Sequence, residues 1–186
     1  MYPGNWRTRG SVALIAPLVV AAGVFAAQPL SDVLPTLPGW HQDHKGSETI
    51  LTPNDLAEGD VFYLSVKNPV SLKRNTVAQW FASEVAKDEK GQGKVLLDRP
   101  TQNKSGILTR IRAFEDKEGH RFVAFYIGVP TPNFQARLIR GTTSPQPEVY
   151  QKYVPAVRQF TVSLARQSGI FPPESERTLV ALAEGL

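Results

Sequence analysis

Two histidines three residues apart, His41 and His44, are the first group in this chain with side chains suited to chemistry. Asp43 lies between them and Glu48 follows, and imidazole with carboxylate is a ligand set that suits zinc or copper. Histidines at this spacing share an ion on a helix or in a constrained loop, whereas here they precede a Lys-Gly turn. We therefore expect no intrinsic metal, and metal binding by this pair is kept as the alternative.

Nucleophilic catalysis needs a serine, threonine or cysteine that an oriented base activates. The chain has three histidines and no cysteine, and none of its serines stands in a Gly-x-Ser-x-Gly elbow. Asp98, Glu115 and Asp116 occupy loop-like or turn-flanking positions, where acidic side chains are common in any case. We expect no catalytic residue and no cofactor. The alternative is a periplasmic hydrolase that uses carboxylates or the His41 and His44 pair.

A group of arginines is the candidate ligand site. Arg110, Arg112 and Arg140 come from adjacent predicted strands, in positions that allow them to share one face beside Phe125. Guanidinium groups beside an aromatic wall hold a carboxylate or phosphate through paired donors. In the alternative, their stems cover the sheet and their charged heads lie in water. We expect any ligand site to lie here and to take a small acidic ligand or an envelope protein as its partner.

The arginines depend on a predicted antiparallel meander for their positions. Three β-rich segments, 107–115, 121–129 and 134–140, are joined by short turn-like connections. If Glu115 faces His120, Arg110 lies near Phe125 and Arg112 near Val123. The opposite face is then the main core, with Ile107, Ile111, Phe122, Ala124 and Ile139. A shift of the register by one residue would exchange the faces.

Further elements complete an α+β fold. Strands are predicted at 47–52 and 60–67, with a short one at 95–97, and apolar residues at helical spacing predict a helix over 76–90. Pro145 and Pro147 predict the start of a second, long helix, which ends at Gly169. The apolar stripe of this helix includes Phe160. The predicted fold is an antiparallel sheet, made of the three-strand meander plus N-terminal strands, packed by two main helices.

The first 27 residues have the layout of an export signal. Arg7 and Arg9 precede an uncharged apolar run at 12–25, which ends in the small residues Ala26 and Ala27. This predicts a periplasmic or secreted protein. Residues 11–27 left uncleaved would instead form an inner-membrane anchor.

The rest of the chain divides into three parts. A proline-rich arm at 28–39, which Trp40 anchors to the core, precedes a single α+β domain at 40–169 and a tail at 170–186 with a short helix over 174–183. Loss of the two signal arginines lowers the net charge from +4 to +2. A net charge this small does not indicate a surface that binds nucleic acid.

The order of these elements resembles the PsbP-like domain. That domain is the α/β/α sandwich shared by the extrinsic photosystem protein PsbP and the Ran-binding Mog proteins. The resemblance spans about residues 40–167 and rests on the early strands, the helix with Trp80 and Phe81, the meander and the long helix ending near Leu164. No residue motif of the family is matched, so no site residue is carried over. The resemblance implies a non-catalytic binding or assembly factor.

The export signal leads to a testable prediction. We expect the protein in the exported fraction to begin near Ala26 or Ala27, because the small-x-small pattern at Val24, Phe25 and Ala26 fits signal cleavage. Intact-mass measurement of that protein locates the cut. A chain that retains Met1 in the membrane fraction would show the anchor instead.

Overall fold

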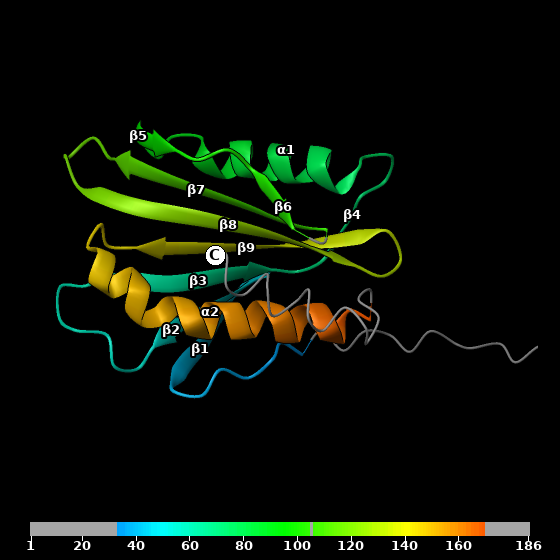
Figure 1. The fold of residues 1–186 in the computed structure, drawn as a ribbon, viewed down its shortest axis with the longest axis horizontal. Helices are drawn as coiled ribbons and strands as arrows, with labels where there is room; N and C mark the ends of the chain where they lie inside the picture. The colour runs from blue at the N-terminus through cyan, green and yellow to red at the C-terminus, as the bar shows by residue number, and fades with distance from the viewer. Residues whose placement is uncertain (1–32, 105, 170–186) are drawn as a thin grey trace, which may run out of the picture.

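A computed structural model describes residues 33–104 and 106–169 of the chain (Figure 1). The expected signal at 1–27 and the tail at 170–186 lie outside the described residues, as do residues 28–32 of the arm. Where the arm is described, Leu37 is buried, and Trp40 packs edge-on against Phe62 and Tyr153, with ring centroids 5.8 and 5.9 Å away. The predicted role of Trp40 as an anchor to the core is confirmed.

The described residues form one antiparallel sheet with two helices, which gives the α+β class that the sequence predicts. The strand order is β1-β2-β3-β9-β8-β7-β5, and the short strands β4 and β6 pair with β9 and β7. The strands are β1 (Trp40–Lys45), β2 (Glu48–Pro53), β3 (Phe62–Lys67), β4 (Val70–Ser71), β5 (Lys94–Asp98), β6 (Gln102–Lys104), β7 (Ile107–Glu115), β8 (Arg121–Thr131) and β9 (Gln135–Thr143).

Strand β1 is an element that the sequence analysis does not predict. Five of its six residues are exposed and polar, so it lacks the alternation of apolar and polar residues that marks a half-buried strand. It forms because the turn after Lys45, where Gly46 has φ +61°, folds it back onto β2 as a hairpin. The histidine pair therefore lies on an edge strand.

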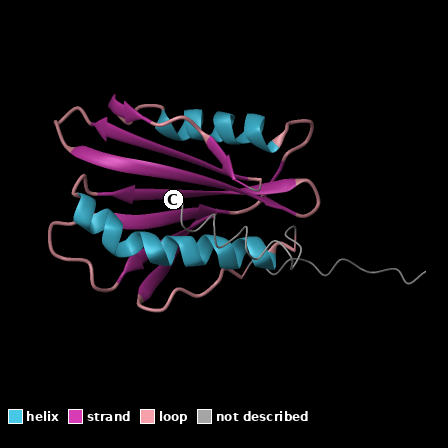
Figure 2. Cartoon of the chain, viewed as in Figure 1, coloured by secondary structure: helices cyan, strands magenta, loops and turns pink. Residues whose placement is uncertain are grey.

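The two helices share buried clusters with alternate residues of the same strands. Figure 2 shows both helices, in cyan, beside the magenta strands of the sheet. Helix α1 (Val77–Glu89) contributes Trp80, Phe81 and Val85 to a cluster that includes Tyr126 of β8. Helix α2 (Pro147–Gln167) contributes its apolar stripe to a second cluster. This cluster includes Phe125, the residue before Tyr126 on β8. Because successive strand residues point to opposite faces, the two clusters lie on opposite sides of the sheet.

The register of the meander differs by one residue from the prediction. Glu115 pairs with Arg121 rather than with His120, so Arg110 lies opposite Tyr126 and Arg112 opposite Ala124. The physical reason is the turn between β7 and β8. Asp116 pairs with His120 across it: the Asp116 amide donates to the His120 carbonyl at 2.9 Å, and the Asp116 carboxylate accepts from the His120 amide at 2.8 Å.

This shift exchanges the faces of β8. Phe125 lies on the α2 side, and the assignment of Phe122 and Ala124 to the side of Ile107 is wrong, because both belong to the α1 side. Phe125 fills the space over Gly141, where an added Cβ would lie 1.8 Å from its ring. The glycine thus makes room for the aromatic ring on the neighbouring strand.

The burial of α2 leads to a stability prediction. Phe160 is 1% exposed within the cluster on the α2 side. Phe160→Ala should lower the free energy of unfolding by about 3–5 kcal/mol, because it removes buried apolar surface and leaves a cavity. Urea unfolding measures the change. The exposed neighbour provides the control, since Gln159→Ala should leave the midpoint nearly unchanged. Equal midpoints for all three proteins would contradict the packing.

Candidate binding cleft

Arg110 and Arg112 meet at one carboxylate of their own chain. Both side chains lie on the α1 side of β7 and ion-pair with Asp98 of β5, at 2.9 Å from Arg110 and 2.6 Å from Arg112. Arg112 also forms an ion pair with Glu89 in the last turn of α1. The two guanidinium groups are therefore brought together, and each holds a carboxylate from a neighbouring element.

The two carboxyl groups respond in opposite ways. Hydrogen bonds from Arg112 and Arg110 hold the pKa of Asp98 well below its usual range. Burial raises the pKa of Glu89, against the opposing attraction of Arg112. Asp98 thus stays ionised at the exposed edge of the sheet, whereas the Glu89 side chain is mostly buried between α1 and the sheet.

Arg140 is held by a different acid. Its Nε lies 3.1 Å from a carboxylate oxygen of Asp88, and its Nη2 donates to Gln92 at 3.1 Å. The fully buried Tyr126 donates its hydroxyl hydrogen to the same carboxylate at 3.1 Å. Burial, followed by the nearby charge of Asp88, raises the pKa of Tyr126, so the hydroxyl remains a donor. Asp88 therefore joins the end of α1 to β8 and β9.

The predicted ligand site is thus divided in the structure. Arg110, Arg112 and Arg140 do share one face of the sheet, but Phe125 is on the other face and does not line it. The aromatic residue of β8 on the same face as the arginines is Tyr126, which is fully buried. A useful signal was present in the sequence, because Asp88 and Glu89 lie in the last turn of the predicted helix.

Two adjoining cavities lie on the part of this face beside α1. The first, of about 450 Å³, extends over β2 and β3 and is lined by Lys45, Glu48, Ile50, Asp60, Asp88 and others. The second, of about 480 Å³, extends toward the turn between β7 and β8 and is lined by His120, Arg121, Phe122, Thr142, Ser144 and others. Both include Val61, Tyr63 and Arg140 in their walls. We call the two cavities together the cleft.

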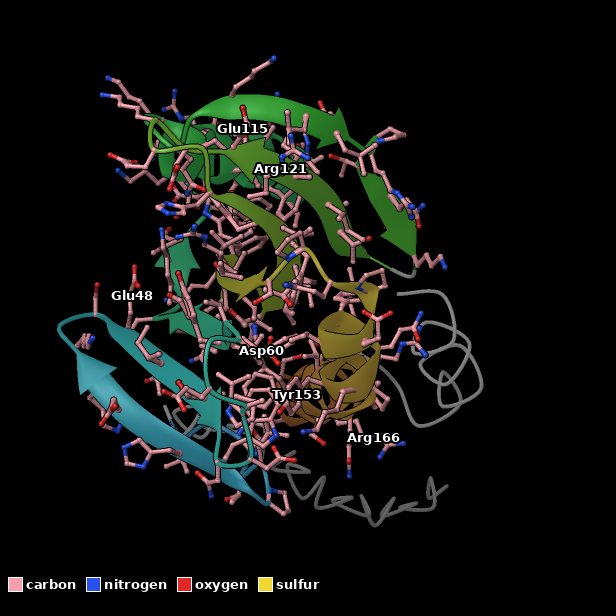
Figure 3. The ribbon with its side chains drawn as sticks, turned by 90° about the vertical axis from the view of Figure 1, so that its left-hand side faces the viewer. Glu48, Asp60, Glu115, Arg121, Tyr153 and Arg166 are labelled. Atoms are coloured by element: carbon pink, nitrogen blue, oxygen red, sulfur yellow. The ribbon has the colours of Figure 1, made fainter. Side chains whose placement is uncertain are left out.

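The two cavities of the cleft are lined by side chains of different charge. Glu48, Asp60 and Asp88 line the first cavity, together with Lys45. Among the described residues, no carboxylate lines the second cavity, whose walls carry arginine and histidine side chains instead. Figure 3 labels Glu48 and Asp60 from the first cavity and Arg121 from the second. An anionic group is favoured in the second cavity, and a cation or hydrogen-bond donor in the first.

Two cationic groups define the second cavity. Arg140 stands where the cavities meet, with its side chain 20% exposed. Arg121 has a side chain that is 64% exposed and pairs through Nε with Glu115 at 2.9 Å. Its position at the start of β8 follows from the observed register. Sequence reasoning missed this site because its walls come from segments far apart in the chain.

The histidine pair does not converge. His41 contacts Asp43 at 3.2 Å, whereas His44 contacts Thr49 at 3.2 Å. Three residues apart on a strand, the two imidazoles point to opposite faces. Among the described residues, the one group with three metal-type ligands in reach of one another is Asp116, Glu118 and His120, in the turn between β7 and β8. The His120 side chain is exposed.

Comparison with known proteins assigns no family: no protein-family model matches the chain, and no curated protein matches it. Within the described part of the chain, no helix is long and apolar enough to cross a membrane.

The ion pairs of Asp98 predict a pH-dependent stability. Its folded pKa is lowered, so below the unfolded pKa of about 4 the unfolded chain takes up a proton that the native state does not yet bind, and the stability gained from the pairs with Arg110 and Arg112 is progressively lost. Wild type should exceed Asp98→Asn in free energy of unfolding above about pH 5, and the difference should shrink as the pH falls below 4. Urea unfolding across this range measures it.

The control for this prediction makes the same chemical change elsewhere. Asp43→Asn alters an exposed acid on β1 and should show a smaller difference from wild type at neutral pH. A gap between wild type and Asp98→Asn that stays constant down to pH 2 would contradict the role of Asp98.

Proposed function

We propose that this protein is an exported, non-catalytic binding or assembly protein of the cell envelope, whose cleft receives an anionic group of its ligand. The observation that carries the proposal is the meeting of two cavities at Arg140, on a side of the sheet where one cavity is cationic and the other rich in carboxylates. Ligand pockets of about 300–1,000 Å³ suit small molecules. A small acidic ligand is therefore the class that fits best.

The chemistry of the second cavity supports this ligand class. A carboxylate or phosphate there lies within the influence of Arg121 and Arg140, and hydroxyl side chains of Thr142 and Ser144 line the same space. Guanidinium forks match such groups with paired donors, and hydroxyls add further donors. The first cavity offers Glu48 and Asp60 to an amino or hydroxyl group on the same ligand. A ligand with both kinds of group would span the cleft.

Location and fold are part of the same proposal. The N-terminal pattern of Arg7 and Arg9 before the apolar run supports export. The PsbP-like resemblance in the order of the elements, with one helix packed on each face of the sheet, supports a role in binding or assembly. A fold alone does not decide function, and the cleft supplies the chemical argument.

A binding experiment tests the cleft. Isothermal titration of the protein with inorganic phosphate, citrate, glutamate and short acidic peptides should find saturable binding to at least one of them. Arg121→Gln should weaken that binding about tenfold, because it removes a charged donor from the second cavity. The Arg121 side chain is mostly exposed, so this variant should fold as wild type does.

Two comparisons keep the test specific. Arg140→Gln should weaken binding further, since Arg140 faces both cavities, and Arg74→Gln, in an exposed loop before α1, should leave binding unchanged. Equal loss in the Arg74 variant would indicate general attraction of anions to a basic protein. Unchanged affinity in both cleft variants would contradict the proposed site.

A further inference from the structure

The turn between β8 and β9 carries an exposed aromatic side chain. Phe134 is 85% exposed, more than any other large apolar side chain among the described residues. The turn lies at one end of the sheet (Figure 1). It extends beyond the last pair of β3 with β9, Val66 with Ile139, and beyond the last pair of β7 with β8, Leu108 with Gly128. The ring therefore stands at the tip of a hairpin that reaches past β3 and β7.

The backbone of this turn has a conformation that an aromatic residue rarely adopts. Asn133 and Phe134 have φ of +60° and +55°, in the left-handed region that favours glycine and asparagine. For Phe134 this conformation is strained, and its exposed ring gains little packing in return. The fold of the turn therefore does not require a phenylalanine. A strained and exposed residue is a reason to look for a function of its side chain.

Two basic residues lie directly beside the turn. The Leu72 amide donates to the Phe134 carbonyl at 2.8 Å, so the next two residues, Lys73 and Arg74, flank the tip of the hairpin. Both are exposed. Within the described residues neither forms an ion pair, whereas the arginines on the α1 side of the sheet are paired with acids. The two charges are therefore available to a partner.

The chain segments that meet at this end of the sheet have no acidic residue. They are 68–79, 101–108 and 128–138, and they contain lysine and arginine but no aspartate or glutamate. The middle segment belongs here because Leu108 pairs with Gly128, which brings the turn between β6 and β7 level with the last residues of β8. The positive charge is thus not balanced locally, and the partner that it favours is anionic.

We propose that this end of the sheet is a membrane-binding surface, at which Phe134 enters the interface of a bilayer and Lys73 and Arg74 contact the head groups of anionic lipids. A single ring that projects from a basic surface suits a bilayer, which yields to it, because a stable protein interface needs about 800 Å² of matching surface on each partner. Aromatic side chains beside lysine and arginine are typical of segments that bind at membrane interfaces. The surface is separate from the cleft, since none of its three residues lines either cavity.

A local fluorophore tests insertion in the full-length protein, whose apolar run at 12–25 would obscure a measurement of total binding to lipid. The natural chain has no cysteine, so Phe134→Cys and Gln42→Cys each provide one site for an environment-sensitive dye. On vesicles of phosphatidylcholine with about one-third phosphatidylglycerol, the dye at position 134 should shift to shorter wavelength and be quenched by iodide about tenfold less. The dye at position 42, on the exposed strand β1, should remain accessible.

Charge variants of the Phe134→Cys protein test the class of lipid. Lys73→Gln together with Arg74→Gln should raise the lipid concentration that gives half of the shift about tenfold, since each basic residue near an anionic surface adds to the binding. The control, Lys90→Gln together with Lys117→Gln, removes the same charge after the end of α1 and in the turn between β7 and β8, and should have little effect. Vesicles of phosphatidylcholine alone should give no shift.

Urea unfolding shows whether the ring serves the fold instead. Phe134→Asn should be at least as stable as wild type, because asparagine tolerates the left-handed backbone and the exposed ring makes little contact. A marked loss of stability would assign the ring to folding and overturn the proposal. An unshifted dye at position 134 on anionic vesicles, equal shifts at positions 134 and 42, an equal shift on neutral vesicles, or equal effects of the two charge variants would overturn it as well.

Discussion

The pairing of β7 with β8 is the constraint on which the rest of the structure depends. Asp116 and His120 close the turn between these strands, and Glu115 consequently pairs with Arg121. Because side chains alternate between faces, this single register decides which residues reach each helix. Phe125 is directed to the α2 side over Gly141, and Tyr126 to the α1 side. A slip of one residue would move the arginines of β7 off the face where α1 ends.

The acids at the end of α1 make this placement necessary. Asp88 and Glu89 lie near the carboxyl end of the helix, where the helix dipole disfavours negative charge. Arg140 and Arg112 from the sheet stand against them and compensate both the dipole and the loss of water. Burial of such pairs adds little net stability, but removal of one partner leaves an uncompensated charge. The ion pairs therefore fix where α1 docks, and through Arg140 they also build the wall shared by the two cavities.

The cleft follows from the width of the sheet. Neighbouring strands are about 4.8 Å apart, whereas a helix with its side chains is about 10 Å wide. One helix therefore covers only part of a face that is seven strands across. On the α1 side, the buried cluster draws on β7, β8 and β9, and the residues of β2 and β3 that point the same way line the first cavity. At the edge of the same sheet, the apolar residues Val95, Leu96 and Leu97 of β5 are 42–47% exposed.

Local sequence patterns predict the elements whose apolar residues recur at a regular spacing. Periodicity predicted α1, the apolar stripe of α2 and the three strands of the meander, because an element that buries one face has apolar residues at a regular spacing. Strand β1 escaped prediction since its polar residues bear no such pattern. The face of Phe125 depended on a single residue of register, which local patterns do not specify when both faces of a strand are apolar. Only the tertiary structure could gather Glu48, Arg121 and Arg140 around one cleft, because strand order is decided by pairing between segments far apart in the chain.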